Sequence, residues 1–420
     1  MNLKHIIITL GLLLATVLLK AQIGTKQNIL SGSNTITTTV PFLLIAPDSR
    51  SGALGDAGVA TIPDVGSQHY NPSKYAFMDK GQDSGFGLAI SYSPWLRHLI
   101  NDMNLAYVSG YAKINRENVL SASFRYFDLG AIQLRDERGG DMGSRNPHEL
   151  AVDFGYARLL SDRFSGSVAL RFIYSNLAAG MSYDNVKIKA GIAAAADVSF
   201  TYLNDDITTF GIPSTIIWGI NISNIGNKIT YTSNDYRDFI PTNFRTGLSY
   251  ALRIDDYNRI MLTYDINKLL VPTPVVYYST RDTLPNGEIV SSGEYIVKEP
   301  EGAKDPREIS VPAALFTSWA DAPGVEFGGS KFREEMAEFT HSIGLEYAYN
   351  ETFFLRAGYF NENAKKGNRK YVTFGIGLQL SAFGLDVSYL LPVTQNNPLA
   401  NTFRFTLKFN FNDLSSNKSK

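Results

Sequence analysis

The chain contains many segments in which apolar and polar residues alternate at every second position. In the last of them, the apolar positions Phe403, Phe405, Leu407, Phe409 and Phe411 are separated by Arg404, Thr406, Lys408 and Asn410. Successive side chains of a strand point to opposite faces, whereas a helix repeats every 3.6 residues, so this spacing predicts a β-strand with one apolar and one polar face. The same alternation occurs at residues 120–126, 150–156, 260–266, 343–349 and 385–389.

These alternating segments are long. They run for about nine to thirteen residues, whereas strands of soluble sandwiches average about five or six, and a tilted strand needs about nine to eleven to cross a bilayer. We therefore expect an all-β protein, a transmembrane antiparallel β-barrel of about 14 strands. The predicted strands span residues 86–93, 103–113, 118–127, 148–160, 164–176, 191–204, 214–224, 242–254, 257–267, 339–350, 352–361, 369–380, 383–391 and 402–411.

Short and long connections alternate between the predicted strands. The short ones are residues 114–117, 161–163, 205–213, 255–256, 351 and 381–382. The long ones are residues 94–102, 128–147, 177–190, 225–241, 268–338, 362–368 and 392–401. Outer-membrane barrels have short periplasmic turns and long extracellular loops, so both ends of the barrel are expected to face the periplasm.

The N-terminus has the composition of an export signal. Lys4 and His5 precede an apolar run at residues 6–19, and Lys20, Ala21 and Gln22 follow it. This order is typical of a cleaved signal peptide, here residues 1–21. A membrane anchor is the alternative, but the run of about 14 residues is shorter than the roughly 20 that a spanning helix needs. We therefore expect a multi-pass barrel in the cell outer membrane with its loops facing the cell surface.

Residues 22–85 show little alternation and contain many turn-forming residues, which are Pro47, Gly52, Gly55, Gly58, Pro63, Pro72 and Gly81. Such a segment is a poor candidate for barrel wall. Because a barrel of this size must fill or plug its interior unless it is a pore, we expect residues 22–85 to form a plug, or hatch, within a barrel at residues 86–411. A disordered periplasmic tail is the alternative. Residues 412–420 are expected to be a polar C-terminal tail.

The polar faces of the predicted strands carry charges of both signs. They are Arg125, Asp153, Arg171, Asp197, Arg245, Asp265, Glu346, Arg356, Asp386, Arg404 and Lys408. Charges are costly in lipid, so these side chains are expected to face the lumen, where the balance of sign favours mutual pairing. The pattern fits either a structural lattice of salt bridges or a path for ions or a substrate.

The connection at residues 268–338 is far longer than an ordinary loop, and loops of this length are usually functional or disordered. It contains Phe316, Trp319 and Phe327 near a predicted short helix at residues 330–339, which Ser330 can cap. Exposed aromatic residues on such a loop favour a surface for a partner protein, and a self-packed lid is the alternative.

The sequence offers little support for catalysis. There is no cysteine, the net charge is −1, and the five histidines, His5, His69, His98, His148 and His341, stand singly without metal-ligand spacing. No phosphate-binding loop or nucleophile elbow occurs. We therefore expect neither enzymatic activity, nor a cofactor or metal, nor nucleic-acid binding, although lipid hydrolases exist among outer-membrane barrels.

Residues 39–99 resemble the PorV family, outer-membrane proteins of the Bacteroidota type IX secretion system. The resemblance rests on the run at residues 40–50, which includes Pro47, Asp48 and Arg50, on Gly55, Asp56 and Gly58, on the run at residues 68–77 around Asn71 and Pro72, and on Pro94, Trp95, Leu96 and Arg97. Asn71 and Pro72 are also similar to the broader superfamily of long-chain fatty-acid transporters, which are fourteen-stranded barrels with an N-terminal hatch. Tyr70 and Ser73 depart from the pattern, where tryptophan and alanine are expected.

The resemblance implies a role in protein transport without catalysis. PorV-like proteins associate with the translocon outer-membrane barrel, bind the C-terminal signal domain of secreted cargo, and deliver cargo to a surface attachment complex that contains a sortase-like protease. On this basis, Pro94, Trp95, Leu96, Arg97, Phe316, Trp319 and Phe327 are candidate partner-binding residues. The alternative function is an outer-membrane transporter of long-chain fatty acids or other hydrophobic molecules, which needs an apolar lumen pocket and a mobile plug.

Overall fold

The computed structural model describes residues 34–78, 81–96, 102–135, 140–180, 182–183, 186–232, 237–274, 277–278, 296–297, 307–324, 327, 329–394, 399–400 and 402–411. The predicted signal peptide at residues 1–21 and the predicted tail at residues 412–420 lie outside these ranges, as do Arg97 and His98. Among the described residues, no helix is long and apolar enough to cross a bilayer.

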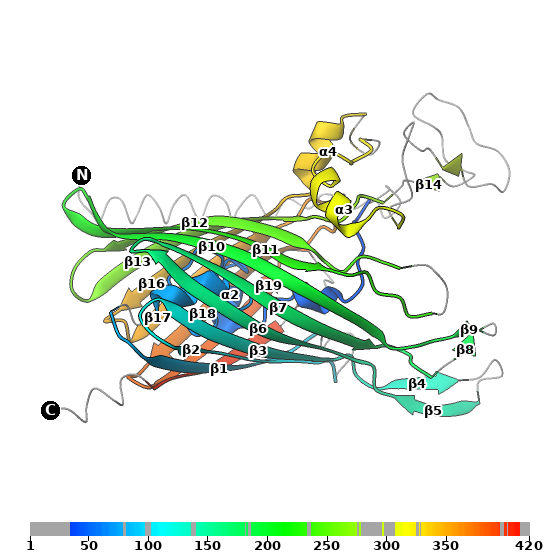
Figure 1. The fold of residues 1–420 in the computed structure, drawn as a ribbon, viewed down its shortest axis with the longest axis horizontal. Helices are drawn as coiled ribbons and strands as arrows, with labels where there is room; N and C mark the ends of the chain where they lie inside the picture. Colours follow the sequence, from blue (N-terminus) through cyan, green and yellow to red (C-terminus); the bar gives the residue numbers. More distant parts are fainter. Residues whose placement is uncertain are drawn as a thin grey trace. The chain divides into compact units, whose positions relative to one another are not determined.

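The described residues form one closed antiparallel barrel of fourteen strands, each hydrogen-bonded to the next, with the first strand paired to the last (Figure 1). The strands are β1 (Gly85–Pro94), β2 (Asn104–Lys113), β3 (Asn118–Asp128), β6 (His148–Ser161), β7 (Phe164–Asn176), β10 (Gly191–Thr209), β11 (Ile212–Gly226), β12 (Asn243–Arg253), β13 (Asn258–Leu269), β16 (Thr340–Tyr349), β17 (Phe353–Asn361), β18 (Lys370–Gln379), β19 (Phe383–Pro392) and β20 (Thr402–Asn410). Closure leaves no unpaired edge in the hydrocarbon region, which is the condition for crossing it with strands. The predicted fold is therefore confirmed.

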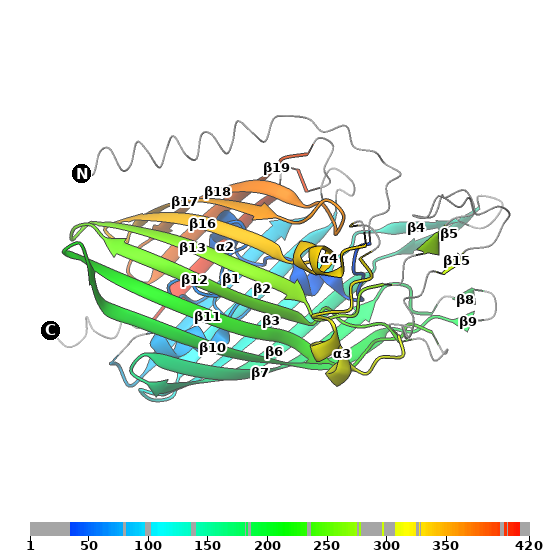
Figure 2. The same ribbon diagram turned by 90° about the horizontal axis from the view of Figure 1, so that it is seen from above.

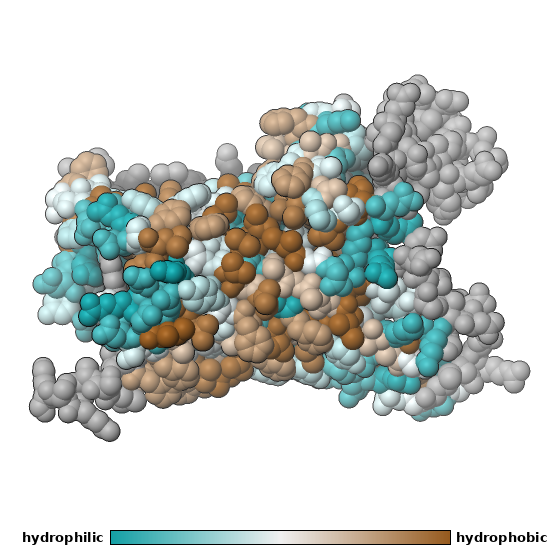
Figure 3. All heavy atoms as spheres, in the orientation of Figure 1, coloured by the Kyte–Doolittle hydropathy of each residue, from teal (hydrophilic) through white to brown (hydrophobic). Residues whose placement is uncertain are grey.

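Exposed and buried residues alternate along each strand, so they line opposite faces of the barrel wall. Leu170 and Phe154 on the outer face are 64% and 66% exposed, whereas their neighbours Arg171 and Asp153 are buried in the lumen. Apolar side chains gather over the middle of the wall and polar ones toward its ends (Figure 3). This distribution matches a band of lipid contact with a polar interior.

The predicted turn at residues 205–213 is wrong in extent. β10 continues to Thr209 and β11 starts at Ile212, so only Phe210 and Gly211 form the turn, both with positive φ (54° and 82°). Two consecutive residues with positive φ are typical of two-residue turns whose twist matches that of the flanking strands. Residues 204–209 are mostly polar, so this end of the hairpin lacks the alternation from which a strand is predicted.

Several long connections contain short elements. Two-stranded sheets are formed by β4 (Ile132–Arg135) with β5 (Asp141–Arg145), by β8 (Ser182–Tyr183) with β9 (Val186–Lys187), and by β14 (Tyr277–Tyr278) with β15 (Ile296–Val297). The loop between β13 and β16 carries α3 (Val311–Thr317) and α4 (Lys331–Ala337). Ser330 accepts a hydrogen bond from the Arg333 amide, so the predicted cap of the second helix is confirmed, whereas α3 was not predicted.

Residues 34–78 run through the interior of the barrel and include η1 (Pro41–Leu44), α2 (Ser49–Ala53) and η2 (Pro72–Phe77). Two perpendicular views place α2 inside the ring of strands (Figures 1 and 2). The amide of Ser49 donates to Thr406 Oγ1 on β20 and that of Gly55 to Thr373 Oγ1 on β18, both at 2.9 Å. These bonds satisfy backbone groups that have no access to water.

Small residues in the wall allow this inner segment to lie directly on it. A Cβ added to Gly358 on β17 would lie 2.0 Å from the Gly55 amide nitrogen, and one added to Gly219 on β11 would lie 2.2 Å from the Val59 carbonyl oxygen. Both positions therefore exclude any side chain. Elsewhere Leu54 and Ala57 pack with barrel residues in a buried apolar cluster.

Candidate functional site

A hub of charges joins the inner segment to one side of the barrel. Glu346 on β16 accepts hydrogen bonds from Arg50 at 2.9 and 3.1 Å and from Arg356 at 2.7 Å. Arg356 also pairs with Asp386 at 2.6 Å. Arg50 reaches Asp64 at 3.0 Å. Burial alone would raise the pKa of Asp64, but the charges of Arg50, Lys408 and Lys74, together with the Arg50 hydrogen bond, outweigh it and lower that pKa to about 2.

A second cluster is built entirely from the wall. Arg171 on β7 pairs with Asp153 on β6 at 2.5 Å and with Asp197 on β10 at 2.9 Å. All three are buried, and the Asn224 amide donates to Asp197 at 2.7 Å. Pairing of this kind offsets the desolvation of each charge. The predicted mutual pairing is present in this cluster and in the Glu346 hub.

The remaining lumen charges bind the inner segment instead of each other. Arg125 donates to the carbonyl oxygens of Phe42 and Leu43 at 3.0 and 3.1 Å. Asp265 accepts from the amides of Gly58 and Val59 at 2.6 and 2.9 Å. The sequence does not predict these contacts, because the partner of each charged side chain is a backbone group, which every residue carries.

Two further arginines sit against inner-segment side chains. The Arg245 guanidinium lies over the ring of Tyr70 at 4.6 Å, and Arg404 is 3.7 Å from Asp56. Lys408 pairs with Asp386 at 2.6 Å. Every charge predicted to face the lumen therefore contributes either to a salt-bridge cluster or to holding residues 34–78.

The family motif residues shape the inner segment itself. Asp48 caps α2 by accepting from the Ser51 amide, and Pro47 beside it is buried. Asn71 accepts from the Ser73 amide, and its Nδ2 donates to Val59 O at 2.8 Å and to Thr201 Oγ1 at 2.9 Å. Caps of this kind satisfy the open amides at the start of a helix.

The residues next to these caps are also constrained by the groups around them. Pro72 occupies the first turn of η2, where a missing amide costs nothing. Gly55 has φ 69°, and a Cβ on Gly58 would lie 2.4 Å from the Tyr70 ring. The unexpected Ser73 is 2.7 Å from Thr201 Oγ1, a contact that alanine could not make.

A cavity of about 460 Å³ lies between the inner segment and the barrel wall and is lined by both. Its lining mixes apolar residues such as Ile36, Leu44 and Phe360 with the charged Arg245 and Arg369. Because charged and apolar groups both line it, the cavity is not a smooth apolar conduit.

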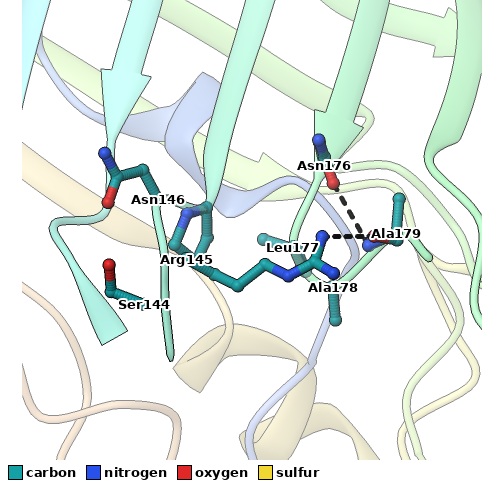
Figure 4. A pocket seen from close by; sticks show the side chains of 8 residues that line it. Ser144, Arg145, Asn146, Asn176, Leu177, Ala178 and Ala179 are labelled. Carbon is teal, nitrogen blue, oxygen red and sulfur yellow. Dashed lines mark hydrogen bonds between the residues drawn. The ribbon is translucent and has the colours of Figure 1, made fainter. Parts of the chain in front are cut away.

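A second hollow of about 580 Å³ opens at the extracellular end, between β5 and the segment after β7 (Figure 4). Its lining residues are Ser144, Arg145, Asn146, Pro147, Asn176, Leu177, Ala178 and Ala179. Arg145 crosses it and donates to the Ala179 carbonyl oxygen at 3.1 Å. The lining offers amide and guanidinium donors together with backbone groups at a solvent-facing rim. We call this hollow the rim cleft.

The candidate partner-binding residues fall into three separate places. Pro94 ends β1, and Trp95 and Leu96 pack against a buried apolar cluster that includes Phe42. Phe316 and Trp319 are 80% and 41% exposed on and just after α3. Phe327 lies 5.0 Å from Lys365 Nζ. The structure therefore does not bring the predicted aromatic residues together on one surface.

The described residues give no support for a catalytic or metal centre. They contain no group of three or more histidine, cysteine or acidic residues that could hold a metal ion. His69 is buried in the inner segment, where burial and the nearby Arg125 hold its pKa well below the ordinary value. It therefore serves as a neutral hydrogen-bonding group beside Arg125.

A closed fourteen-stranded barrel with an apolar outer wall and a charged interior defines the class: an outer-membrane β-barrel protein. A model of the family described as type IX secretion system protein PorV matches residues 28–276, more than half of the chain, and the chain belongs to this family. It is thus an outer-membrane component of type IX secretion, a family of transport proteins and not of enzymes.

No curated protein sequence matches the chain. Among solved structures, the Pseudomonas putida toluene transporter TodX is 10% identical, with 90% of this chain and 98% of that chain covered at a TM-score of 0.43. A Pseudomonas aeruginosa FadL homologue is 9% identical, with 90% and 99% covered and a TM-score of 0.43.

Proposed function

We propose that the protein binds the translocon barrel and the C-terminal signal domain of secreted cargo, and that it delivers cargo to a surface attachment complex containing a sortase-like protease. The observation that carries this proposal is the filled lumen. Residues 34–78 are tied to the wall through Asp265 on β13, Arg125 on β3 and Glu346 on β16. A barrel held closed in this way acts through its surfaces, and its family acts in protein secretion.

The rim cleft is the cargo-binding surface in this proposal. It lies between extended segments at the solvent-facing end, and β4 and β5 pair only with each other among the described residues. Exposed strand edges and convergent backbone donors suit an extended peptide, which gains main-chain hydrogen bonds on binding. Arg145 adds a positive charge at which a peptide carboxylate can bind.

In this proposal Trp95 and Leu96 have a structural role, because they already pack against the buried apolar cluster. The translocon then binds at the extracellular end, including those parts of the loop between β13 and β16 that lie outside α3 and α4. Pro94, at the end of β1, belongs to the support of that end.

The test substitutes the rim cleft and recovers partners from outer membranes. Arg145→Glu reverses the charge that crosses the cleft, and Asn146→Arg fills it. We expect cargo recovery to fall by about tenfold or more, equivalent to about 1.4 kcal/mol of binding free energy, while translocon recovery is retained. Arg163→Glu, an exposed arginine in the β6–β7 turn, is the matched control.

The outcomes separate the two parts of the proposal. Unchanged cargo recovery with both variants would exclude the rim cleft as the cargo site. Absence of both translocon and cargo from the unmodified protein's co-purifying chains would overturn the function itself.

The lumen cavity favours a second candidate function, transport of a hydrophobic molecule. Ile36, Leu44 and Phe360 supply apolar surface there, but the inner segment closes the way to the periplasm. Transport therefore requires that segment to shift. Uptake of a fluorescent fatty acid into vesicles holding the unmodified protein would support this function, and uptake equal to that of empty vesicles would remove it.

A further inference from the structure

The helix α4 has its polarity inverted relative to a helix on a water-exposed surface. Its acidic residues Glu334 and Glu335, and Glu338 at its C-terminus, are buried at 8% exposure or less. Phe332 and Met336, four residues apart, are 72% and 46% exposed. Surface helices of soluble proteins bury the apolar face and expose the charges. α4 instead buries its carboxylates and exposes Phe332 and Met336 beside the basic Lys331 and Arg333, a composition that suits the boundary between lipid and water.

The buried glutamates neutralise two lysines at the end of the barrel wall. Lys268 near the end of β13 is 3.0 Å from Glu335 and also pairs with Glu338. Lys366, in the loop between β17 and β18, is 2.6 Å from Glu334 and 3.0 Å from Glu338. A lysine next to lipid is costly unless it is paired, and α4 supplies the partners.

Lys268 is itself a sign of this environment. It follows Leu262, Tyr264 and Ile266 at two-residue spacing, which is the outward-facing register of β13, yet it is only 1% exposed. The helix covers Lys268 from the outer side, while Lys268, Glu338 and Lys366 also border the lumen cavity.

The segment after α3 lies against the same outer wall. The ring of Trp319 meets that of Phe244 edge-on at 5.1 Å, and Phe244 alternates with the buried Asn243 and Arg245 on β12, so it faces outward. Trp319 also lies 6.3 Å from Phe339. Both helices lie on the outer side of the barrel beside the extracellular ends of β12 and β13 (Figures 1 and 2).

We propose that α3 and α4 form an interfacial anchor in the outer leaflet of the membrane, with Phe316, Trp319, Phe332 and Met336 inserted among the acyl chains. The argument for lipid is continuity with the lipid-facing wall, since Trp319 packs on Phe244, which lies on the same outward face of β12 as the exposed Leu248. Helices in this position bury their apolar face at the boundary of headgroups and acyl chains.

Two exposed basic residues, Lys331 and Arg333, flank Phe332. Their charges lie where the phosphate groups of anionic lipids would meet them. The anchor therefore pairs apolar insertion with headgroup attraction, the combination by which a peripheral helix binds a charged lipid surface. This inference does not depend on the proposed role in secretion.

The test measures depth in a bilayer with the purified full chain. Because the protein has no cysteine, single cysteines can be placed and spin-labelled at will. Phe316→Cys and Phe332→Cys report on the anchor, Leu262→Cys on the barrel wall, and Ile132→Cys on an extracellular hairpin. The probes are oxygen, which partitions into lipid, and a water-soluble nickel chelate, in vesicles of phosphatidylcholine and phosphatidylglycerol.

We expect the ratio of oxygen to nickel accessibility at Phe316→Cys and Phe332→Cys to be at least about fivefold above that at Ile132→Cys and to approach that at Leu262→Cys. Arg333→Cys, one residue away on the same helix, is expected to lie between the two references. Correct folding of each variant is checked by its heat-dependent migration on a gel.

A ratio at Phe316→Cys and Phe332→Cys equal to that at Ile132→Cys overturns the proposal. The purified protein is alone in the vesicle, so a face made for a protein partner would also give this result. Insertion that disappears when phosphatidylglycerol is omitted supports the headgroup contact of Lys331 and Arg333.

Discussion

Glu346 shows how one residue can join the wall to the segment inside it. Three guanidinium groups approach its carboxylate, from Arg50, Arg356 and Arg259, and none of its surface is open to solvent. Removing one partner of a buried ion pair costs more than the pair contributes in total, because the remaining charges stay buried without compensation.

Substituting Glu346 should therefore destabilise the whole barrel. We expect Glu346→Gln to lower the free energy of unfolding by about 3–5 kcal/mol, since three buried arginines lose their shared anion. The measurement is guanidinium-induced unfolding of the protein in lipid vesicles, followed by tryptophan fluorescence.

The matched control is Glu117→Gln in the exposed pair with Arg158. Exposed pairs contribute little, so its change should stay within about 0.5 kcal/mol. Equal midpoints for Glu346→Gln and the unmodified protein would show that the hub is not structural.

The contacts of single residues were the least predictable part of the site. That Glu346 and Asp265 face the lumen follows from strand alternation, and the structure agrees. That Arg50 is the partner of Glu346 does not follow, because the two are 296 residues apart and meet only through the register of the closed barrel. The Arg125 contact with backbone carbonyls was equally hidden.

At the level of elements, alternation located the fourteen strands because one face of each is apolar. It failed where a strand leaves the bilayer, as in β10 after Asn204, since both faces are then polar. The helix α3 has a short sequence signal, since Ser310 caps its first turn and Pro312 stands at its start. The burial of the α4 glutamates depends on their pairing with Lys268 on β13, a contact that the sequence pattern does not predict.

The contact between the segment after α3 and the segment after β13 should depend on pH. Asp321 accepts hydrogen bonds from Thr273, and burial raises its pKa to about 6, helped by Glu335 and Glu338 and opposed by the Thr273 hydrogen bonds. The folded segment therefore binds a proton more tightly than the unfolded one. Its stability is greatest below about pH 4 and falls as the pH rises to about 6.

Hydrogen exchange of residues 310–324, corrected for its intrinsic pH dependence, tests this expectation. Protection should fall between about pH 4 and pH 6 in the unmodified protein, and Asp321→Asn should flatten that slope. Asp255→Asn in the β12–β13 turn should leave the slope unchanged. A slope that persists in Asp321→Asn would assign the titration to another group.

On the scale of the whole molecule, the barrel is a closed wall around a fixed interior. Salt bridges, backbone hydrogen bonds and close glycine contacts attach residues 34–78 to strands on several sides, including β3, β13 and β16. A lumen of this size conducts ions only if its interior is open to water. The described interior instead contains packed side chains of the inner segment and a cavity of about 460 Å³.

The unmodified protein should therefore give no steady ionic conductance in a planar lipid bilayer. A full-length variant that combines Arg50→Ala with Asp265→Ala removes two attachments of the middle of the inner segment, to β16 and to β13, so we expect intermittent channel openings in single-channel recordings. Each change leaves a buried partner uncompensated, which favours water entry around the loosened segment. The exposed pair Arg116→Ala with Asp83→Ala is the control and should remain silent. Steady conductance of the unmodified protein at the level of the variant would mean that the interior is a path, and it would shift the balance from a docking protein toward a transporter.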